Sequence, residues 1–577
     1  MLNSVVRFIR LAGRISSGAN RNLMLWQSIA GVVALILGFW GWMNHAPPQD
    51  YTGWFNNLFR TIQLITLQFP TSLEQGIPWQ LHIARLAVPL VAALATFNVL
   101  VGAISRPVRL AMIPSAHEHI ILIGSEQLAV AALKTLADHG RQIVVMTPAI
   151  ELGRRETLES LGFTIVEADP HQPATLAGLN LVRATAVFLT HENDLENIDL
   201  TMQVVSNSCG RSPDKPPLIL GVLIADDDLA RELDATLDNV ARAHNVRYHR
   251  LCPDRDGLRE DLRTKAPVFL KANKTTRSHV LIVGLEAPWE QSLMQVIISS
   301  QDHPDLPALF TIVASGDELA ALAFWRSERP DLSLIAEFIL IDSGQRLLPT
   351  EDQMEAWRRQ TPTPQIVIVL RPDSEAVATT MALRRFGSVF GMSSEQILVR
   401  RSQEDRLLGQ LAGDGPKVTP FGGLIRAAAI ERVLDLAGED IAIALHAHYL
   451  ENATALGAGS PAALAAWDGL PENLRDANRA SADHISILFT AVNLEPQRPE
   501  SITPENIETM ARIEHRRWIA DRIDRGWRSG AKRDNIHLIH PSIQPFDALS
   551  HEDQEKDRNA VRVLASLAVA MPTRRDK

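Results

Sequence analysis

Hydrophobic positions follow three different patterns along the 577-residue chain, and each pattern predicts a different architecture. The first pattern is a long apolar run, which occurs at Leu23 to Trp42 and again at Leu86 to Ile104. These stretches have 20 and 19 residues without a charge, so each is long enough to cross a hydrocarbon core of about 30 Å as a helix. We therefore predict an α-helical hairpin with two membrane spans in residues 1–110.

Arginines flank the two predicted spans unevenly. Most of them stand outside the hairpin, whereas the connection between the spans carries only Arg60 and, at its very end, Arg85. The flanking residues are Arg7, Arg10, Arg14, Arg21, Arg106 and Arg109. Because positive residues concentrate on the cytoplasmic side, we expect both termini in the cytoplasm and the hairpin in the cell inner (plasma) membrane. A cleaved signal peptide fits poorly, since the apolar run is too long and a second span follows.

The connection between the spans is amphipathic from Trp54 to Leu67 and ends in Thr66-Leu67-Gln68-Phe69-Pro70. A short apolar helix followed by a polar loop predicts a re-entrant, pore-type helix. The polar positions expected to line a water-filled path are Thr61, Gln63, Thr66 and Gln68. This layout resembles the pore unit of tetrameric potassium channels, which implies a homotetramer around a central pore.

One feature of that family is missing from the loop. Potassium channels use a Thr-Val-Gly-Tyr-Gly filter, in which two glycines let successive carbonyls face a dehydrated ion. Residues 61–70 of this chain contain no glycine, so potassium selectivity is not implied. Two interpretations remain open: a wider and less selective pore, or a sealed anchor that only oligomerises.

The second pattern begins at His119, where short apolar runs alternate with helical segments. This alternation predicts a doubly wound α/β domain with a parallel, Rossmann-like sheet over residues 116–270. Its expected strands are His119 to Gly124, Gln142 to Thr147, Phe163 to Glu167, Thr185 to Thr190 and Pro217 to Ala225. The alternation starts again after a polar linker and predicts a second, degenerate domain of the same class over residues 278–400. The strands expected there are His279 to Leu285, Ala308 to Ser315, Glu337 to Asp342 and Gln365 to Arg371.

Three short motifs mark the first of these domains. They are Ile-Ile-Leu-Ile-Gly124, the Glu-Ala-Asp169-Pro turn, and Ala-Val-Phe-Leu-Thr190-His-Glu-Asn-Asp194 with Asn197. Together they resemble the RCK (regulator of potassium conductance) nucleotide-binding domain. The resemblance implies a nucleotide site, and the residues assigned to it are Gly124, Ser125, Ala129, Asp169 and Thr190.

The nucleotide chemistry of that family does not transfer completely. A dinucleotide fingerprint needs a glycine where the backbone approaches the pyrophosphate, and an acid at the end of the second strand. Here Glu126 stands in the loop and the second strand ends in Thr147. NAD binding in the standard pose is therefore not expected. The alternative is that this domain is structural, and that it oligomerises and takes part in gating without binding a nucleotide. The second domain, with Val283-Gly284-Leu-Glu286, lacks the later glycines as well.

The third pattern is helical and dominates residues 420–577, which we predict to be a mostly α-helical domain. In the predicted helix Pro504 to Arg525, the core-facing positions are Met510, Ile513, Ala520 and Ile523. Four other side chains recur at spacings of three and four and therefore share the opposite face of the helix. They are His515, Trp518, Arg522 and Arg525.

The sequence around this helix carries a long ordered motif. It runs Met510-Ala-Arg-Ile-Glu514-His515-Arg-Arg-Trp518 and continues with Gly526-Trp527, Gly530, Arg533-Asp534, His540-Pro541, Leu549 and Asp557. The motif closely resembles the ryanodine-receptor (RyR) repeat domain, and the resemblance extends back through Trp467 and Ser481-Ala-Asp483. It implies a recognition module and no known reaction.

Basic and aromatic side chains gather in this motif. Guanidinium groups match phosphate oxygens, and tryptophan offers a stacking face for a ring. We therefore expect a small anionic or phosphorylated ligand, such as a nucleotide. The residues assigned to its site are His515, Trp518, Arg522, Arg525, Trp527 and Arg533. The alternative is that these residues make the fold, with the tryptophans in the core and the arginines on a solvated helix face.

Composition narrows the classes of function. A net charge of −10 is mild for this length, so a nucleic-acid polymer is not expected as a partner. Cys209 and Cys252 are too few for a disulfide framework or a zinc site, and neither a metal site nor a catalytic motif is predicted. We predict a membrane-embedded, ligand-gated ion channel or membrane effector, and not an enzyme, in which the C-terminal sensor acts through RCK-like domains on the pore. The alternatives are a non-conducting, membrane-anchored scaffold and, with less support, an NAD-dependent enzyme.

Overall fold

The computed structural model describes residues 20–69, 76–111, 113–124, 142–212, 214–269, 277–386, 397–401, 418–422, 439–456, 463–495 and 501–568. The chain divides into two compact units. One comprises Met1–Glu126 with Ala137–Ala184, and the other comprises Gln127–Leu136 with Thr185–Lys577. The first unit carries the N-terminal hairpin, and the second carries the C-terminal helices.

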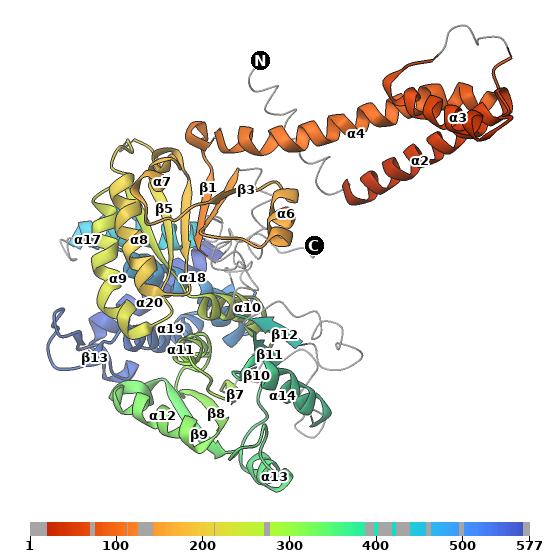
Figure 1. Cartoon of the computed structure of the whole chain (residues 1–577). Helices are drawn as coiled ribbons and strands as arrows, with labels where there is room; N and C mark the ends of the chain where they lie inside the picture. Colours follow the sequence, from red (N-terminus) through yellow and green to blue (C-terminus); the bar gives the residue numbers. More distant parts are fainter. Residues whose placement is uncertain are drawn as a thin grey trace. The chain divides into compact units, whose positions relative to one another are not determined.

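The N-terminal hairpin consists of two long helices with a short helix between them (Figure 1). Its elements are α2 (Asn20–His45), α3 (Tyr51–Gln63), the 3-10 helix η1 (Leu64–Thr66) and α4 (Trp79–Ala111). Helices α2 and α4 lie side by side. A glycine allows their close approach, because a Cβ on Gly41 would come within 2.6 Å of the Leu81 side chain. Small residues have this role at helix contacts in membranes.

Two segments of these helices, Trp26–His45 and Trp79–Phe97, are long and apolar enough to cross a membrane. The first overlaps the predicted span, whereas the second begins at Trp79 and not at Leu86. The helix includes the charged Arg85, whose guanidinium group lies over the ring of Phe69, 5.8 Å from its centroid. Large apolar side chains remain exposed along both segments, which marks a surface for a membrane or for another protein.

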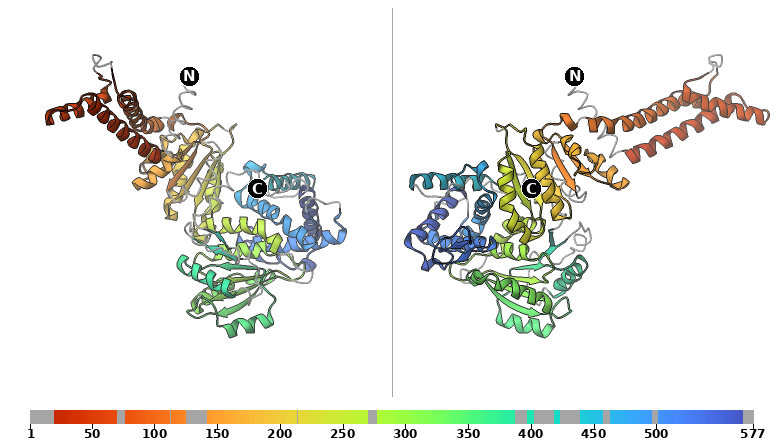
Figure 2. Two further views of the ribbon diagram at one scale, coloured as in Figure 1. Left: turned by 90° about the vertical axis from the view of Figure 1, so that its right-hand side faces the viewer. Right: turned by 60° about the vertical axis from the view of Figure 1, so that its left-hand side comes forward.

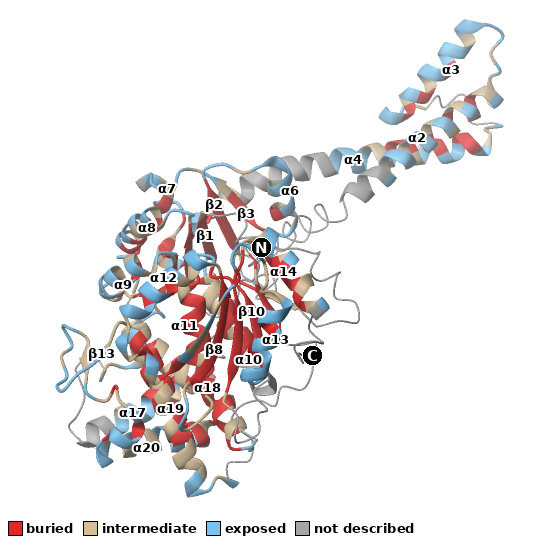
Figure 3. Cartoon of the chain, turned by 90° about the horizontal axis from the view of Figure 1, so that it is seen from below, coloured by how far each residue is buried: buried red, intermediate tan, exposed pale blue. Residues whose placement is uncertain are grey.

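The first sheet contains six parallel strands in the order β3-β2-β1-β4-β5-β6. The strands are β1 (Ile120–Gly124), β2 (Ile143–Thr147), β3 (Thr164–Glu167), β4 (Ala186–Thr190), β5 (Leu218–Leu223) and β6 (Val246–Leu251). The helical elements are η3 (Ile113–Ser115), α6 (Leu152–Ser160), α7 (Pro173–Ala177), η4 (Leu181–Arg183), α8 (Asp194–Asn207), α9 (Asp227–Arg242) and α10 (Pro253–Phe269). The strands are largely buried, as is typical of a parallel sheet covered by helices (Figure 3).

The second sheet repeats this topology. Its order, β12-β11-β10-β7-β8-β9, matches the first sheet when each sheet is numbered from its own first strand. The strands are β7 (His279–Val283), β8 (Ala308–Ala314), β9 (Ala336–Asp342), β10 (Ile366–Val369), β11 (Ile397–Arg400) and β12 (Val418–Phe421). The helical elements are α11 (Glu290–Ser299), α12 (Gly316–Ser327), η5 (Pro330–Leu334), α13 (Glu351–Gln360) and α14 (Asp373–Phe386). The chain thus contains two doubly wound sheets of one topology.

The C-terminal segment is mostly helical and packs beside the second sheet (Figure 2). Its elements are α17 (Asp440–Leu456), η8 (Trp467–Gly469), α18 (Glu472–Ala491), α19 (Pro504–Asp524), β13 (Arg528–Ser529), β14 (Ile539–His540), η10 (Phe546–Ala548) and α20 (His551–Ala568). Helix α19 contributes side chains to two hydrophobic cores. Met510 and Ile513 join the core among the C-terminal helices, whereas Ile519 and Ile523 join the core of the second sheet, which includes Phe310.

The predicted fold class is confirmed for both sheets and for the helical C-terminal segment. Every predicted strand is present. The structure adds β6, β11 and β12 to the two large sheets, and the short pair β13 and β14 in the C-terminal segment, none of which was predicted. Strand β12 pairs with β11 and completes the second sheet, so this domain extends past residue 400. Strand β6 has the sequence Val-Arg-Tyr-His-Arg-Leu, and its polar residues do not match the apolar pattern of the other strands. These residues can be buried because they pair with residues of the C-terminal helices.

Candidate functional site

The C-terminal end of α19 turns sharply and carries Trp527 toward His540. Gly526 has a φ of +80°, which favours glycine. Its N–H donates to the carbonyl of Ile523 at 3.0 Å, and the Trp527 N–H donates to the carbonyl of Arg522 at 2.9 Å. These two bonds form a Schellman motif, which ends a helix on a left-handed glycine. The glycine-tryptophan pair in the sequence therefore has a structural reason.

Four aromatic rings form a cluster beside this turn. The ring of His540 lies 5.0 Å from that of Trp518 and 5.8 Å from that of Trp527, measured between centroids. His515 stacks on Trp518 at 5.8 Å. Both tryptophans are half-buried and pack against the core that α19 shares with the second sheet. This aromatic cluster of His515, Trp518, Trp527 and His540 is thus fixed on one side and accessible on the other.

His515 is committed to the fold. Its Nδ1 lies 3.0 Å from the carboxylate of Asp557 in α20, and its Nε2 lies 2.9 Å from the carbonyl of Gln544. Burial raises the pKa of Asp557, although the hydrogen bond with His515 opposes that effect. Because both ring nitrogens already face acceptors, neither is left for a ligand. We assign His515 the role of positioning Trp518.

Two guanidinium groups lie over the tryptophan rings. Arg522 is 5.4 Å from the centroid of Trp518, and Arg533 is 5.9 Å from that of Trp527. Among the described residues, the guanidinium group of Arg522 has no hydrogen-bond or ion-pair partner, and its buried Nε is unsatisfied. Burial lowers the pKa of Arg522 to about 10; the charge of Asp521 opposes this effect, and neighbouring arginines add to it. A partly buried cation of this kind gains most from an anion that supplies the missing acceptors.

His540 adds a neutral donor to the site. Its Nδ1 accepts the Ser542 N–H at 3.1 Å, so the proton of the neutral ring lies on Nε2. Burial, together with the charges of Arg533 and Arg522, lowers the pKa of His540 to about 4. The site therefore combines two cations, one N–H donor and two tryptophan faces. This chemistry suits an anionic ligand that carries a ring.

Arg525 does not join this group. Its guanidinium lies 2.9 Å from Asp521 on its own helix and 3.5 Å from Asp476 of α18. The side chain is therefore turned toward α18 and ion-paired, because it stands at the end of α19 where that helix meets α18. The expectation of an exposed arginine that shares the site with Arg522 does not hold for this residue.

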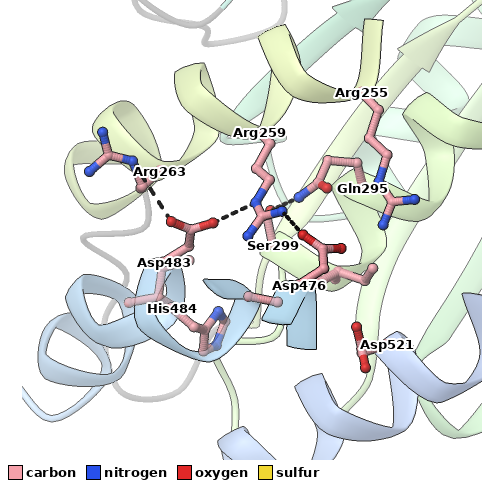
Figure 4. A pocket seen from close by; sticks show the side chains of 12 residues that line it. Arg255, Arg259, Arg263, Gln295, Ser299, Asp476, Asp483, His484 and Asp521 are labelled. Carbon is pink, nitrogen blue, oxygen red and sulfur yellow. Dashed lines mark hydrogen bonds and ion pairs between the residues drawn. The ribbon is translucent and has the colours of Figure 1, made fainter. Parts of the chain in front are cut away.

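A network of charges joins α18 and α19 to α10, and Figure 4 shows most of its members. Arg255 of α10 pairs with Asp524 of α19 at 2.9 Å. Arg259 of α10 bridges Asp476, at 2.8 Å, and Asp483, both on α18. The network borders a cavity of about 20 Å³, which has room for about one water molecule and none for an organic ligand. It is a structural junction.

A second network buries charges between β6 and α18. Arg475 and Arg479 of α18 and His249 of β6 converge on Glu472, at 2.7, 2.8 and 2.7 Å respectively. Burial raises the pKa of Glu472, but Arg479, His249 and Arg475 outweigh it and hold this pKa well below its usual range. The carboxylate is therefore ionised in the folded chain. We refer to these four residues as the Glu472 network.

Helices α18 and α19 also bind a loop of the second sheet. Arg516 of α19 donates to three backbone carbonyls of the loop 301–306, one of them at 2.9 Å. His484 of α18 bonds a fourth carbonyl of this loop at 2.8 Å. Helix α19 thus carries the unpaired Arg522 together with residues that contact α10 and the second sheet.

Two family models match separate parts of the chain. The model described as RyR domain matches residues 491–572, and the model described as TrkA-N domain matches residues 120–212. The chain contains a RyR domain and a TrkA-N domain. The first match covers α19 and the aromatic cluster and confirms the C-terminal resemblance over residues 491–572, whereas its extension back through Trp467 and Ser481-Ala-Asp483 stays a prediction. The second covers β1 to α8 and confirms the RCK-like resemblance.

Similar solved structures include GsuK proteins. One described as the GsuK channel is 17% identical, covers 72% of this chain and 96% of its own, and has a TM-score of 0.32. One described as GsuK bound to ADP is 18% identical, covers 72% and 100% of the two chains, and has a TM-score of 0.30. TM-scores this low support no conclusion about ligand or assembly. A search among curated proteins found no match.

The predicted nucleotide-binding residues of the TrkA-N domain are described only in part. Gly124 ends β1 with a φ of +116°, which a glycine adopts without strain. The Asp169 carboxylate accepts a backbone N–H of its own turn at 3.0 Å, and Thr190 is buried at the end of β4. Ser125 and Ala129 lie outside the described residues. Nucleotide binding by this domain stays a prediction.

The four predicted pore residues lie in and after α3. Thr61 is buried, and its hydroxyl donates to the carbonyl of Asn57 at 2.8 Å, so this side chain faces the interior of the hairpin. Gln63 is half-buried, whereas Thr66 and Gln68 are exposed. The Thr66 hydroxyl donates to the Gln63 carbonyl at 3.0 Å. Of the four, Thr66 and Gln68 are the most accessible to water or ions.

Proposed function

We propose that this protein is a membrane-embedded, ligand-gated channel or membrane effector whose RyR domain binds a small phosphorylated, ring-bearing ligand such as a nucleotide. The observation that carries the proposal is Arg522, a partly buried cation that lies over the face of Trp518 and whose guanidinium group has no partner in the part of the chain that the structure describes. Arg533 and His540 supply further donors beside it. An oxyanion would satisfy the guanidinium group, while the ligand ring would stack on a tryptophan.

Ligand binding on α19 has a direct route to the rest of the chain. The helix holds the loop 301–306 through Arg516 and meets α10 through Asp524. Helix α10 follows β6, the last strand of the first sheet. A ligand that prefers one position of α19 would therefore bias both sheets. Its effect is limited to its difference in affinity between the two positions.

We place the hairpin in a membrane with both termini in the cytoplasm, because its two helices are long and apolar enough to cross one and arginines flank them on the outside. A single hairpin cannot enclose water, so a pore requires several copies around an axis. The resemblance to potassium channels makes that number four.

Single-channel recording of the reconstituted full-length protein is expected to show currents with little preference for potassium over sodium. The physical reason is the loop of residues 61–70, which has no glycine to aim successive carbonyls at a dehydrated ion. Strong potassium preference would contradict this account of the loop. A detergent-extracted protein that stays monomeric and passes no current would favour the non-conducting scaffold.

Substitution of Arg522 by alanine is expected to weaken ligand binding roughly tenfold or more, because a hydrogen bond to a charged group contributes about 1.5 to 3 kcal/mol. The measurement is calorimetric titration of the full-length protein with AMP, ADP and inorganic pyrophosphate. Arg562→Ala is the matched control, because it removes the same charge from the exposed side of α20. The partners that the structure describes for Arg562, Glu555 and Asn559, stand on its own helix.

The two variants separate a site from a general effect of charge. Arg562→Ala is expected to bind like the parent, and both variants should melt close to it. The proposed site is overturned if Arg522→Ala and Arg562→Ala bind the responding probe equally well, or if the parent binds none of the three.

A further inference from the structure

The second sheet has a topological switch point, the position at which sheets of this topology form a ligand crevice. The strand order reverses between β7 and β10, and in open parallel sheets the ligand crevice lies beyond the carboxyl ends of the strands at such a point. The loop after β7 begins with Gly284, whose φ of +82° suits the first glycine of a phosphate-binding loop. Loops after β7, β8 and β10 border this switch point.

The backbone N–H groups of the loop after β7 are already occupied. Those of Gly284 and Glu286 donate to backbone carbonyls of Val313 and Leu370, at 2.8 and 3.0 Å. The N–H between them, on Leu285, donates to the side-chain carboxylate of a residue in α12, Glu318, at 2.8 Å. Residues 284–286 therefore retain no N–H for a phosphate.

The carboxylate of Glu318 collects donors from all three loops. It accepts the N–H and the hydroxyl of Ser315 at 2.7 and 2.9 Å, and Nη1 of Arg371 lies 3.2 and 3.3 Å from its two oxygens. The contacts with Ser315 form an ordinary capping box at the start of α12. Capping does not explain the contacts with Leu285 after β7 and with Arg371 after β10.

Arg371 is built into the same arrangement. It is 9% exposed, and its stem packs against Gly284, where an added Cβ would come within 2.5 Å of the arginine Cδ. The glycine thus makes room for a side chain of this chain. Burial raises the pKa of Glu318, but the hydrogen bonds from Leu285 and Ser315 and the charge of Arg371 outweigh it and lower this pKa.

We propose that the switch point of the second sheet is an oxyanion site whose occupant is the carboxylate of Glu318. The carboxylate takes the place of a ligand phosphate and ties together the loops after β7, β8 and β10. The second sheet consequently takes no nucleotide and remains in one closed arrangement. This inference does not rest on the proposed function of the RyR domain.

Anion rescue tests the proposal on the full-length protein in detergent. Glu318→Ala is expected to lower the melting temperature by roughly 4 °C or more, because it leaves the Leu285 N–H and Arg371 without their acceptor. Sodium formate or sodium phosphate should restore much of that loss, whereas sodium chloride at the same ionic strength should not. The quantity compared is the rise in melting temperature that the anion gives the variant, minus the rise that it gives the parent. Anion binding at Arg522 is common to both proteins and therefore cancels in this difference.

The matched control is Gln353→Ala. Gln353 closes a capping box with Thr350 at the start of α13 and has no partner beyond it among the described residues. This variant should lose stability without recovering it in formate or phosphate. Glu318→Gln should also melt lower than the parent and stay insensitive to anions, since the amide fills the space.

Four outcomes decide between an oxyanion site and a simple helix cap. Selective recovery of Glu318→Ala by formate or phosphate supports an oxyanion site. If formate or phosphate changed the melting temperatures of Glu318→Ala and Gln353→Ala equally, Glu318 would act only as a helix cap, and the proposal would be overturned. Should Glu318→Ala fail to fold in chloride, folding only in formate or phosphate would support the site, and failure in all three salts would overturn it.

Discussion

Replacement of Glu472 by glutamine is expected to lower the free energy of unfolding by about 3 to 5 kcal/mol. His249, Arg475 and Arg479 share this carboxylate, and all three are buried. The substitution removes the carboxylate that Arg475 and Arg479 share and, among the described residues, leaves Arg475 with only Asp238, at 3.9 Å, and Arg479 with Glu439. Losing a buried partner in this way costs far more than breaking an exposed pair. The measurement is urea unfolding of the full-length protein, monitored through tryptophan fluorescence.

The control for this experiment is Glu552→Gln. Glu552 pairs with Lys556 at 3.2 Å on the surface of α20, and its side chain is 84% exposed. Its loss is expected to cost at most about 1 kcal/mol. Small and equal losses for both variants would show that water reaches the Glu472 network and that its charges are not buried.

Acidification from pH 6.5 to pH 4 is expected to destabilise the second unit by several kcal/mol. Burial lowers the pKa values of His279 and His484 to about 4, and both side chains are almost inaccessible to water. In the unfolded chain these groups bind a proton below about pH 6.5, whereas the folded chain binds one only near pH 4. Each histidine therefore removes up to about 3 kcal/mol as the pH falls through that window.

Buried carboxyl groups with raised pKa values oppose this trend, among them Asp234, Asp238, Glu290, Asp302 and Asp557. Burial raises the pKa of Asp302 to about 6, so the folded chain holds this proton at a higher pH than the unfolded chain does, and the group adds stability as the pH falls. Melting curves at several pH values check the net result. The variant His484→Asn should show a flatter dependence on pH. Unchanged melting temperatures between pH 7 and pH 4.5 would contradict the assignment of neutral, buried histidines.

Periodicity predicted the parts of the fold that are apolar. The strands at Ile120, Ile143 and Ala308 are continuous apolar runs with helices between them, so alternation alone located them. Strand β6 escaped because Arg247 and His249 are polar, and only their partners on the C-terminal helices make burial acceptable. No local pattern reveals partners that lie more than 200 positions away in the sequence.

The candidate site was predicted in part for the same reason. Helical spacing correctly placed Trp518 and Arg522 together, and the motif supplied Trp527. Spacing could not show that Arg525 turns to Asp476, because that acid belongs to another helix. His540 was not assigned to the site, although it stands in the RyR motif and contacts both tryptophans.

Helix α19 contributes Ile519 and Ile523 to the core of the second sheet. A chain cut at the apparent boundary near residue 420 would leave an uncovered apolar surface on both pieces, with buried charges beside it. The RyR domain of this protein therefore depends on the second sheet to cover part of its apolar surface. A transfer of the RyR domain to another protein would need an equivalent apolar surface to cover Ile519 and Ile523.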